Sequence, residues 1–416
     1  MTTEDNKMNE NKKIVGVTFF SVLQGLSNKY VIHNKDYKDY VDDLFEEKRL
    51  DLKTEIFFKI SLPSLQGMDK QGCSYSHYIL YSKQLPEKYK MNIKESINKY
   101  SFLRGVEIDD YIDFDIKNIL NEDIDKGEVF AYFGLDDDDL ISIDYLQKIK
   151  NYVNKEFVGF NICLSKGFSG YYDGEVSNVR ELRFPFINIG QARICNRENN
   201  GNIYIPNKGS HMRTDEKCPT VIDSTSPTFF WLRHHMQDTF STADKSEIKT
   251  KINRDLDEHD YPKSSILAKF PVLKEYIIPT NLFLKSTRKN ILLNNRKAVE
   301  KIPLGMSPEK IIDGHLVIKY SLNNLDGISR RQALAVFELS ESLSENEANL
   351  AGLAKSKLGY YRYFNTAGSN INGTFSLYLP EGVNLTSISL MKWADESVLL
   401  DTIEVFEANN STVNHV

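Results

Sequence analysis

The sequence has 416 residues, of which 41% are hydrophobic and 26% charged, a composition typical of folded proteins. A chain of this length exceeds one ordinary hydrophobic core and therefore predicts two or three domains. The net charge of −6 argues against a general nucleic-acid binder, because no strong positive field would recruit phosphates. The four cysteines form no CxxC pair, which excludes a common zinc-ribbon pattern and gives no sign of a disulfide framework.

The first 13 residues are polar and predict a disordered lead-in, since they lack the apolar core of a signal peptide. No run approaches the 18 apolar residues of a membrane span. We therefore expect a cytoplasmic protein. The basic segment 281–301 is read as a solvated helix, with a patch for anionic lipid or polysaccharide as the alternative. That alternative leaves peripheral association with the inner face of the membrane open.

Strands and helices alternate from residue 14 onward. Helices are predicted over about 36–60, 85–100 and 142–154, and "LPSL" (62–65) interrupts the helical material that precedes it. Apolar, β-branched and aromatic runs predict strands at 14–20, 75–82, 101–108, 127–135 and 156–164. This order predicts an α/β, Rossmann-like domain over 14–240 with a mixed, mostly parallel sheet. In such sheets ligands gather at the carboxyl ends of the strands.

The remaining sequence changes in character twice. Residues 241–310 are predicted to form a helical connecting segment. From 311 to 416, short β-type runs such as "HLVIKYSL", "ALAVFELS" and "DTIEVFE" alternate with turn residues. They predict a small antiparallel β-sandwich as an accessory domain.

Four consecutive aspartates, Asp136 to Asp139, follow the predicted buried strand at 127–135. Neighbouring carboxylates about 5 Å apart repel by about 3 kcal/mol at an effective dielectric constant of about 20. A solvated acidic surface is the simplest interpretation of such a run. Its position after a buried strand and its DxD spacing favour a divalent cation that bridges to the phosphates of a nucleotide. An EF-hand is excluded, because the alternation and the glycine of that loop are missing.

Several motifs together resemble a known family. "FFSVL" (19–23), "SLPSL" (61–65), "YILYSKQLPEKY" (78–89), "LDDDD" (135–139), "SKGF" (165–168), "INIGQA" (187–192), "GSH" (209–211) and "SPTFFWLRHHMQD" (226–238) occur in the expected order. The chain resembles the bacterial rhamnosyltransferase family, whose members are GT-A-type glycosyltransferases dependent on nucleotide sugars. The family often has an arginine before the Phe-Ser and another before the Leu of the aspartate motif. Phe19 or Phe20 and Gly134 stand there instead, which leaves the donor sugar open.

The resemblance implies a role for each matching residue. Asp138, Asp139 and His235 would hold a divalent cation, Mn²⁺ or Mg²⁺. The residues implied in donor binding are Phe20, Ser21, Asp136, Asp137, Gln191 and His211. An inverting transfer also needs a carboxylate base, and the candidates are Asp215, Glu216, Asp223 and Glu181, among which the sequence does not choose. A retaining mechanism stays open.

The leading hypothesis is an enzyme that transfers a sugar from a nucleotide donor to a glycan or lipid-linked glycan in capsule or lipopolysaccharide synthesis. The alternative is a catalytically inactive GT-A-like protein that recognises glycan through the β-sandwich. For that role the tyrosines at 360, 361, 363 and 378 and Trp393 are candidates. A metal-dependent phosphoesterase that uses the same aspartates is a third hypothesis. Oligomeric state is not predicted.

Overall fold

The computed structural model describes residues 11–23, 37–109, 115–207, 209–237, 263–277, 289–293, 297–298, 301–304, 315–324, 333–364, 370–392 and 398–407. The chain divides into two compact units, which are described separately. The first comprises Met1–Ser169, Glu181–Leu232 and Ser264–Glu275. The second comprises Gly170–Arg180, Arg233–Lys263 and Tyr276–Val416.

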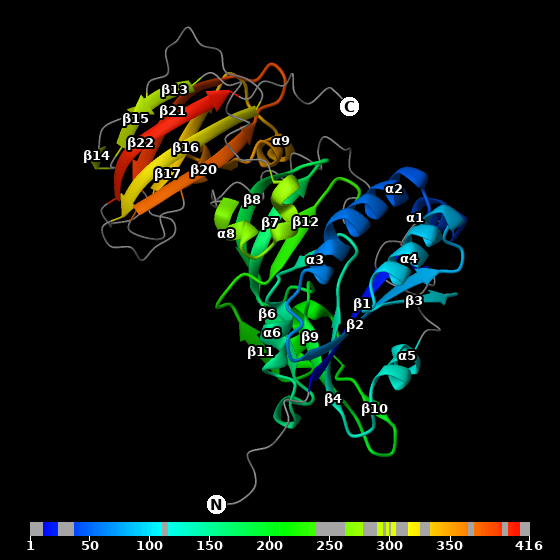
Figure 1. Ribbon diagram of the computed structural model, residues 1–416. Helices are drawn as coiled ribbons and strands as arrows, with labels where there is room; N and C mark the ends of the chain where they lie inside the picture. Colours follow the sequence, from blue (N-terminus) through cyan, green and yellow to red (C-terminus); the bar gives the residue numbers. More distant parts are fainter. Residues whose placement is uncertain are drawn as a thin grey trace, which may run out of the picture. The chain divides into compact units, whose positions relative to one another are not determined.

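A mixed sheet forms the centre of the first unit (Figure 1), in the order β11-β6-β9-β4-β1-β2-β3, with β10 beside β9. The strands are β1 (Lys12–Phe20), β2 (Cys73–Ser82), β3 (Leu103–Ile108), β4 (Val129–Gly134), β6 (Asn161–Leu164), β9 (Ala192–Arg197), β10 (Ile203–Tyr204) and β11 (Thr220–Asp223). β1 pairs in parallel with β2 and β4, β2 with β3, and β6 with β11, whereas β9 is antiparallel to its neighbours. The predicted α/β fold with a mostly parallel sheet is confirmed.

Both faces of this sheet are buried, which explains the near-continuous apolar sequence of β1. Successive strand residues point to opposite faces. Ile14 and Phe20 pack on one face with helices α2 (Glu47–Ile56), α4 (Glu87–Lys99) and α6 (Tyr145–Lys150). Val15 and Val17 pack on the other face with α5 (Ile116–Asp123), a helix that the sequence did not predict. The remaining short helices around the sheet are α1 (Tyr37–Leu44) and η2 (Lys155–Phe157).

The helical segment 47–66 contains a π-helical turn. α2 continues without a break into η1 (Phe57–Ser61) and then into α3 (Leu62–Gln66), with Pro63 in the first turn of α3. Proline lacks an N–H and its ring crowds the carbonyl four residues earlier. A π turn widens the helix at that point and accommodates both effects. The expectation that "LPSL" interrupts the helix is therefore wrong.

A buried histidine lies between the central strands. The imidazole of His77 is fully buried, and its two ring nitrogens hydrogen-bond with Thr18 Oγ1 at 2.9 Å and with the Tyr75 hydroxyl at 2.7 Å. Burial lowers the pKa of His77 to about 3. A Cβ on Gly16 would meet the His77 ring and lie 2.7 Å from Phe133 Cζ. The absence of a side chain at Gly16 thus provides the space for the imidazole.

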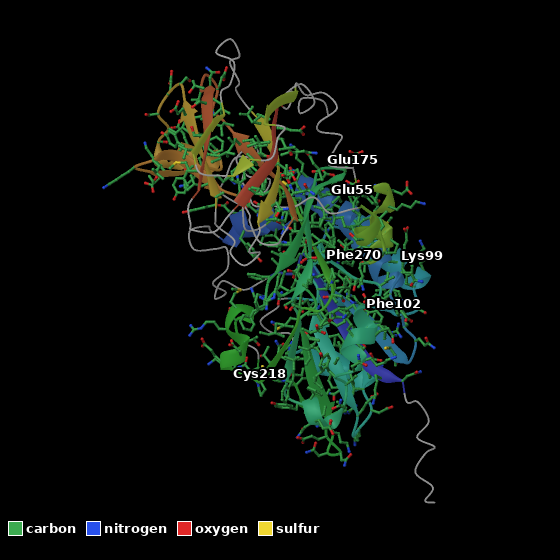
Figure 2. The ribbon with its side chains drawn as sticks, turned by 90° about the vertical axis from the view of Figure 1, so that its left-hand side faces the viewer. Glu55, Lys99, Phe102, Glu175, Cys218 and Phe270 are labelled. Carbon is green, nitrogen blue, oxygen red and sulfur yellow. The ribbon has the colours of Figure 1, made fainter. Side chains whose placement is uncertain are left out.

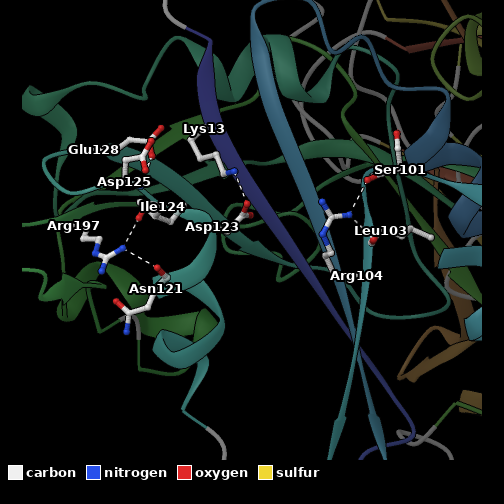
Figure 3. Close-up of polar contacts among 10 residues, drawn as sticks. All are labelled: Lys13, Ser101, Leu103, Arg104, Asn121, Asp123, Ile124, Asp125, Glu128 and Arg197. Atoms are coloured by element: carbon white, nitrogen blue, oxygen red, sulfur yellow. Dashed lines mark hydrogen bonds and ion pairs between the residues drawn. The ribbon is translucent and has the colours of Figure 1, made fainter. Parts of the chain in front are cut away.

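Polar contacts tie α5 to the amino-terminal edge of the sheet (Figure 3). Lys13 Nζ lies 2.7 Å from Asp123 Oδ1, and both side chains are largely buried. At the end of α5, Arg197 Nη1 donates to the carbonyl oxygens of Asn121 at 2.8 Å and of Ile124 at 2.6 Å. Last-turn carbonyls of a helix have no partner within the helix, so Arg197 stabilises this end. The Lys13–Asp123 ion pair and the hydrogen bonds of Arg197 therefore stabilise the packing of α5 on the sheet.

Replacing Lys13 by methionine should destabilise the first unit without affecting its chemistry. We expect the free energy of unfolding to fall by about 2 kcal/mol, less than the roughly 3–5 kcal/mol of a fully buried pair, because both partners retain some exposure. Urea unfolding measures the loss. A change in kcat of the folded variant would contradict a purely structural role.

A second, smaller sheet accompanies the first, in the order β5-β12-β7-β8. Its strands are β5 (Leu140–Ile141), β7 (Lys166–Tyr172), β8 (Val176–Arg183) and β12 (Phe229–Arg233). Phe270, labelled in Figure 2, packs edge-on against Phe168 and Phe230, with ring centroids 6.1 and 5.7 Å away. The short helices α8 (Lys263–Leu267) and η5 (Pro271–Glu275) lie later in the chain, and η3 (His211–Glu216) precedes β11.

The carboxyl-terminal part of the second unit is a β-sandwich (Figure 1), as predicted. One sheet has the order β13-β22-β16-β20 with β14 beside β22, and the other the order β15-β21-β17-β19-β18. The strands are β13 (Lys289–Leu293), β14 (Lys297–Ala298), β15 (Lys301–Leu304), β16 (His315–Asn324), β17 (Ala333–Leu339), β18 (Ala354–Ser356), β19 (Gly359–Tyr363), β20 (Asn370–Tyr378), β21 (Leu385–Lys392) and β22 (Val398–Glu407). Their inward residues, such as Leu316, Phe337 and Leu390, form one core.

Two expectations for this region are corrected. Residues 281–301 were expected to be helical, but their described part forms β13, β14 and the start of β15, which pair with β22 and β21. Lys289 pairs with Phe406 and Leu304 with Ile388, partners so far along the chain that local sequence could not reveal the pairing. The sandwich also contains a short helix, α9 (Glu345–Leu350), where none was expected. Ser344 and Glu347 form its capping box.

Candidate functional site

The aspartate run lies where the central strands β1 and β4 end. Their parallel register finishes at Val17 opposite Gly134, and the Leu135 amide then donates to the Val17 carbonyl at 2.9 Å. The next four residues make a tight turn, in which the Asp139 amide approaches the Asp136 carbonyl at 3.3 Å. The run therefore occupies the carboxyl edge of the sheet, as the sequence predicts.

The four carboxylates differ in burial, which separates them chemically. Asp136 is exposed and Asp138 half-buried, whereas Asp137 and Asp139 are only 4% and 3% exposed. Buried carboxylates require a cation or hydrogen-bond donors to stay ionised. Asp136 and Asp138 thus form an outer DxD pair. Asp137 and Asp139 form an inner pair whose negative charge the protein or a ligand must neutralise.

Asp137 is paired with a lysine from α2. Lys53 Nζ lies 2.8 Å from Asp137 Oδ2, and the two side chains are 12% and 4% exposed. Burial raises the pKa of Asp137 above its usual value, and the charges of Lys53 and Arg49 oppose this rise. Asp137 was predicted to bind the donor, but its carboxylate already makes a buried ion pair.

Asp139 makes no ion pair with a lysine or arginine in the part of the chain that the structure describes. Burial, together with the charges of Asp138 and Asp136, raises its pKa well above the usual value, and a hydrogen bond from the Leu232 backbone opposes the rise. Its Oδ1 is buried and has no hydrogen-bond partner among the residues that the structure describes. A positive charge that approached this oxygen would therefore be stabilised strongly.

Ser21 lies at the same edge, directly after β1. It has a positive φ of 49°, and no other described non-glycine residue shares this feature. Its side chain is 3% exposed, and Oγ is buried with no hydrogen-bond partner in the described part of the chain. Strained backbone and an unsatisfied hydroxyl cost free energy and are often found at ligand sites. Phe20 instead packs on Phe57 and Phe58 in the core, with centroids 5.6 and 5.9 Å away.

Gln191 is brought close to the run by the antiparallel strand β9. Ala192 pairs with Phe133, so Gln191 is next in register to Gly134. Its Nε2 lies 3.1 Å from Cys163 Sγ, and its buried Oε1 has no hydrogen-bond partner among the described residues. A Cβ at Gly134 would find nothing within 4 Å. The site therefore has room at the position where the family often has an arginine.

The predicted base candidates lie at opposite edges of the sheet. Asp215 and Glu216 belong to η3, which precedes β11 and so lies near the amino end of that strand, away from the aspartate run. His211 begins the same helix. Cys218, labelled in Figure 2, anchors this segment through its contact with the Thr214 carbonyl. The grouping of these three residues with the aspartates is thus not supported, because the parallel pairing of β11 with β6 fixes the direction of the chain.

Asp223 and Glu181 fit the required edge better. Asp223 is the last residue of β11, three strand spacings or about 14 Å from β4. Burial pulls its pKa upward, but hydrogen bonds from the Thr225 amide and hydroxyl to Oδ1 outweigh it and leave the pKa below its usual value. Glu181 Oε2 lies 3.0 Å from Lys166 Nζ, and Lys166 begins β7 just after β6.

The metal assignment is only partly reflected in the geometry. Within the described ranges, no group of three or more histidine, cysteine, aspartate or glutamate side chains is arranged to hold a metal ion. Magnesium-type sites commonly take one or two carboxylates from the protein and complete the shell with water and substrate phosphates. Asp138 and Asp139 fit such a site. His235 belongs to the second unit, and its role as a ligand stays a prediction.

Sequence reasoning missed Lys53 and Arg49. Both lie on α2 at i and i+4 and contribute positive charge near Asp137. The signal was present as a basic pair in a helix that also carries buried Leu50 and Ile56. Nothing in the local sequence indicated that this helix lies against a turn 84 positions later.

Comparison with known proteins identifies the family of the chain. The family model described as "Putative rhamnosyl transferase" matches residues 13–246, more than half of the chain. The chain therefore belongs to the rhamnosyl transferase family that this model describes. No protein of curated function matches the chain.

Solved structures of S. aureus TarS (residues 1–349) are also similar to the chain. The first is 12% identical, covers 59% of this chain and 64% of that one, and has a TM-score of 0.30. The complex with UDP-GlcNAc is 12% identical, with 66% and 76% covered and a TM-score of 0.32. The complex with UDP is 12% identical, with 64% and 70% covered and a TM-score of 0.29. Scores this low transfer no site details. In the described part of the chain, no helix is long and apolar enough to cross a membrane.

Proposed function

We propose that this glycosyltransferase moves a sugar from a nucleotide-sugar donor to a glycan or lipid-linked glycan acceptor of a bacterial surface polysaccharide, with a divalent cation as cofactor. The observation that carries the proposal is the aspartate turn at the carboxyl edge of β1 and β4, with buried Asp139 lacking a partner for Oδ1 among the described residues. Family membership supports the reaction class.

The residues of the turn fit a divalent cation. Asp138 and Asp139 supply the hard carboxylate oxygens that Mn²⁺ and Mg²⁺ prefer, and donor phosphates would supply further oxygens. When bound, the cation would neutralise charge on the leaving diphosphate. Asp136 at the exposed end of the turn and the hydroxyl of Ser21 would bind and orient the donor. Gln191, beside them in register, would contact the transferred sugar.

The base of an inverting transfer must lie on the acceptor side of the reacting carbon. We propose Asp223, because it ends a strand at the same edge as the aspartate run and its lowered pKa keeps it ionised at neutral pH. Its Oδ2 makes no hydrogen bond with a described residue, so it can accept a proton. Asp223→Asn should lower kcat by about 10²–10⁴-fold with little change in donor KM. Activity within about threefold of wild type would exclude this role.

A ligand screen tests the proposal. Thermal shifts with UDP-, GDP-, dTDP- and CMP-sugars, each with and without Mn²⁺, should give one donor that raises the unfolding midpoint only when Mn²⁺ is present. Slow hydrolysis of that donor by the purified protein then distinguishes a transferase from the alternative, an inactive glycan-binding protein. Absence of any donor-dependent shift would contradict the proposal. Equal turnover of simple phosphate esters would favour a phosphoesterase.

A further inference from the structure

We infer that Lys53 is a positioning residue for the aspartate turn: its buried ion pair holds Asp137 away from the ligand, so that Asp138 and Asp139 are placed to bind the cation. This inference rests on the proposed function and adds a residue from outside the motif. The ion pair joins two segments that meet only in the folded protein, α2 and the turn after β4.

The first support is the burial of the pair. Lys53 Nζ lies 2.8 Å from Asp137 Oδ2, and the two side chains are only 12% and 4% exposed, so both charged groups are almost fully removed from water. A buried ion pair of this kind contributes little net stability compared with an apolar pair. It does, however, fix one arrangement, since leaving either charge alone inside the protein is costly.

The second support is the alternation along the turn. Asp136 is exposed, Asp137 buried and Asp138 half-buried, so the lysine withdraws the carboxylate between the two members of the DxD pair. Without that withdrawal, three consecutive carboxylates would compete for one cation and repel one another. Lys53 thereby removes one carboxylate from the competition, which leaves Asp138 and Asp139 for the cation and Asp136 at the exposed end of the turn.

The third support is the rigidity of the helix that carries the lysine. Leu50 and Ile56 on α2 are fully buried, and Arg49 Nη1 donates to the Leu44 carbonyl at 3.0 Å. The ammonium group of Lys53 is therefore carried by a packed helix and not by a loop. Asp139, two residues beyond Asp137, keeps an oxygen without a partner among the described residues. That oxygen indicates a ligand at the turn independently of the Lys53–Asp137 ion pair.

The test measures binding of Mn²⁺ alone, through the shift of each variant's unfolding midpoint relative to its own metal-free value. Lys53→Met should raise the half-saturating Mn²⁺ concentration by about tenfold or more. Lys53→Arg, which keeps the charge, should stay within about threefold of wild type. Lys88→Met is the matched control, because it breaks the exposed ion pair of Asp51 on the same helix, and it should leave Mn²⁺ binding unchanged.

The double variant Lys53→Met/Asp137→Leu decides the mechanism. If the lysine acts through Asp137, removing both charges should bring half-saturation back to within about threefold of wild type. A double variant as weak as Lys53→Met would overturn the inference, because the lysine would then act on the ligand directly. Unchanged binding in Lys53→Met would overturn it as well.

Should Lys53→Met not fold, Lys53→Gln replaces it, because its amide is polar but cannot neutralise Asp137. The same loss of about tenfold or more, with recovery in Lys53→Gln/Asp137→Leu, is expected. Wild-type binding in Lys53→Gln would refute the inference. If the wild-type protein itself shows no response to Mn²⁺, the proposed metal dependence fails, and the inference fails with it. If the wild-type protein responds to Mn²⁺ and the variants bind Mn²⁺ equally well, the proposed function stands and only the inference is lost.

Discussion

Replacing Asp138 by asparagine should lower sugar transfer by about 10³-fold or more while leaving the fold intact. The substitution keeps the shape of the side chain and removes the charge that would hold the cation against the donor diphosphate. Asp138 is half-buried, so the neutral amide would keep contact with solvent. Donor-dependent release of nucleotide, measured at saturating Mn²⁺, gives the loss, and circular dichroism reports the fold.

Asp109→Asn is the matched control for this experiment. Asp109 is an exposed aspartate whose carboxylate lies 2.8 Å from Lys83 Nζ, at the end of β3. Its substitution removes the same charge from the same sheet and should leave transfer within about twofold of wild type. Full activity in Asp138→Asn would remove Asp138 from the site. Equal losses in both variants would point to net charge in place of metal binding.

The buried imidazole of His77 should make the first unit sensitive to acid. Its folded-state pKa is about 3, whereas an unfolded histidine has a pKa near 6.5. Below pH 6.5 the His77 imidazole is therefore protonated in the unfolded chain but stays neutral in the folded chain. The free energy of unfolding consequently falls as pH falls. Between pH 7 and pH 5 the loss from this group is about 2 kcal/mol, and by pH 3 it approaches 4–5 kcal/mol.

Urea unfolding at pH 7 and pH 5 tests this expectation. Trp231 lies in β12 of the first unit, and with Trp393→Phe its fluorescence reports that unit alone. In the same background, His77→Gln removes the titrating group and should lose about 2 kcal/mol less than its parent on acidification. The same pH dependence in both proteins would show that His77 does not titrate as its burial implies.

Much of the fold could be predicted because local sequence determines it. β1, β2 and β4 are buried along most of their length, so their sequences are rich in apolar and aromatic residues. The helices between them follow the spacing of apolar residues. The strands β13 to β15 escaped prediction because their pairing depends on β21 and β22, far along the chain.

For the site, the sequence could predict the position of the aspartate run but not which base candidate lies at the same edge of the sheet. The edge that carries Asp136–Asp139 follows from a strand followed by a helix, and the structure places it there. The base was harder, because candidates within a dozen residues of one another lie at opposite edges once β11 takes its direction. Asp215 precedes that strand and Asp223 ends it. Strand direction is a tertiary property that the sequence between them does not encode.

The π turn at Phe57–Ser61 also sets the angular phase of the helix that contains it. Each residue advances an α-helix by about 100°, so one residue more or fewer between Lys53 and Pro63 rotates the two ends relative to each other by that angle. With the turn present, Lys53 lies against Asp137 while Leu62 and Leu65 stay in the core. A homologue that lacked one residue here could keep its core or its lysine contact, but not both. The length of this helix therefore serves two contacts at once, the packing of its carboxyl-terminal end and the ion pair of Lys53.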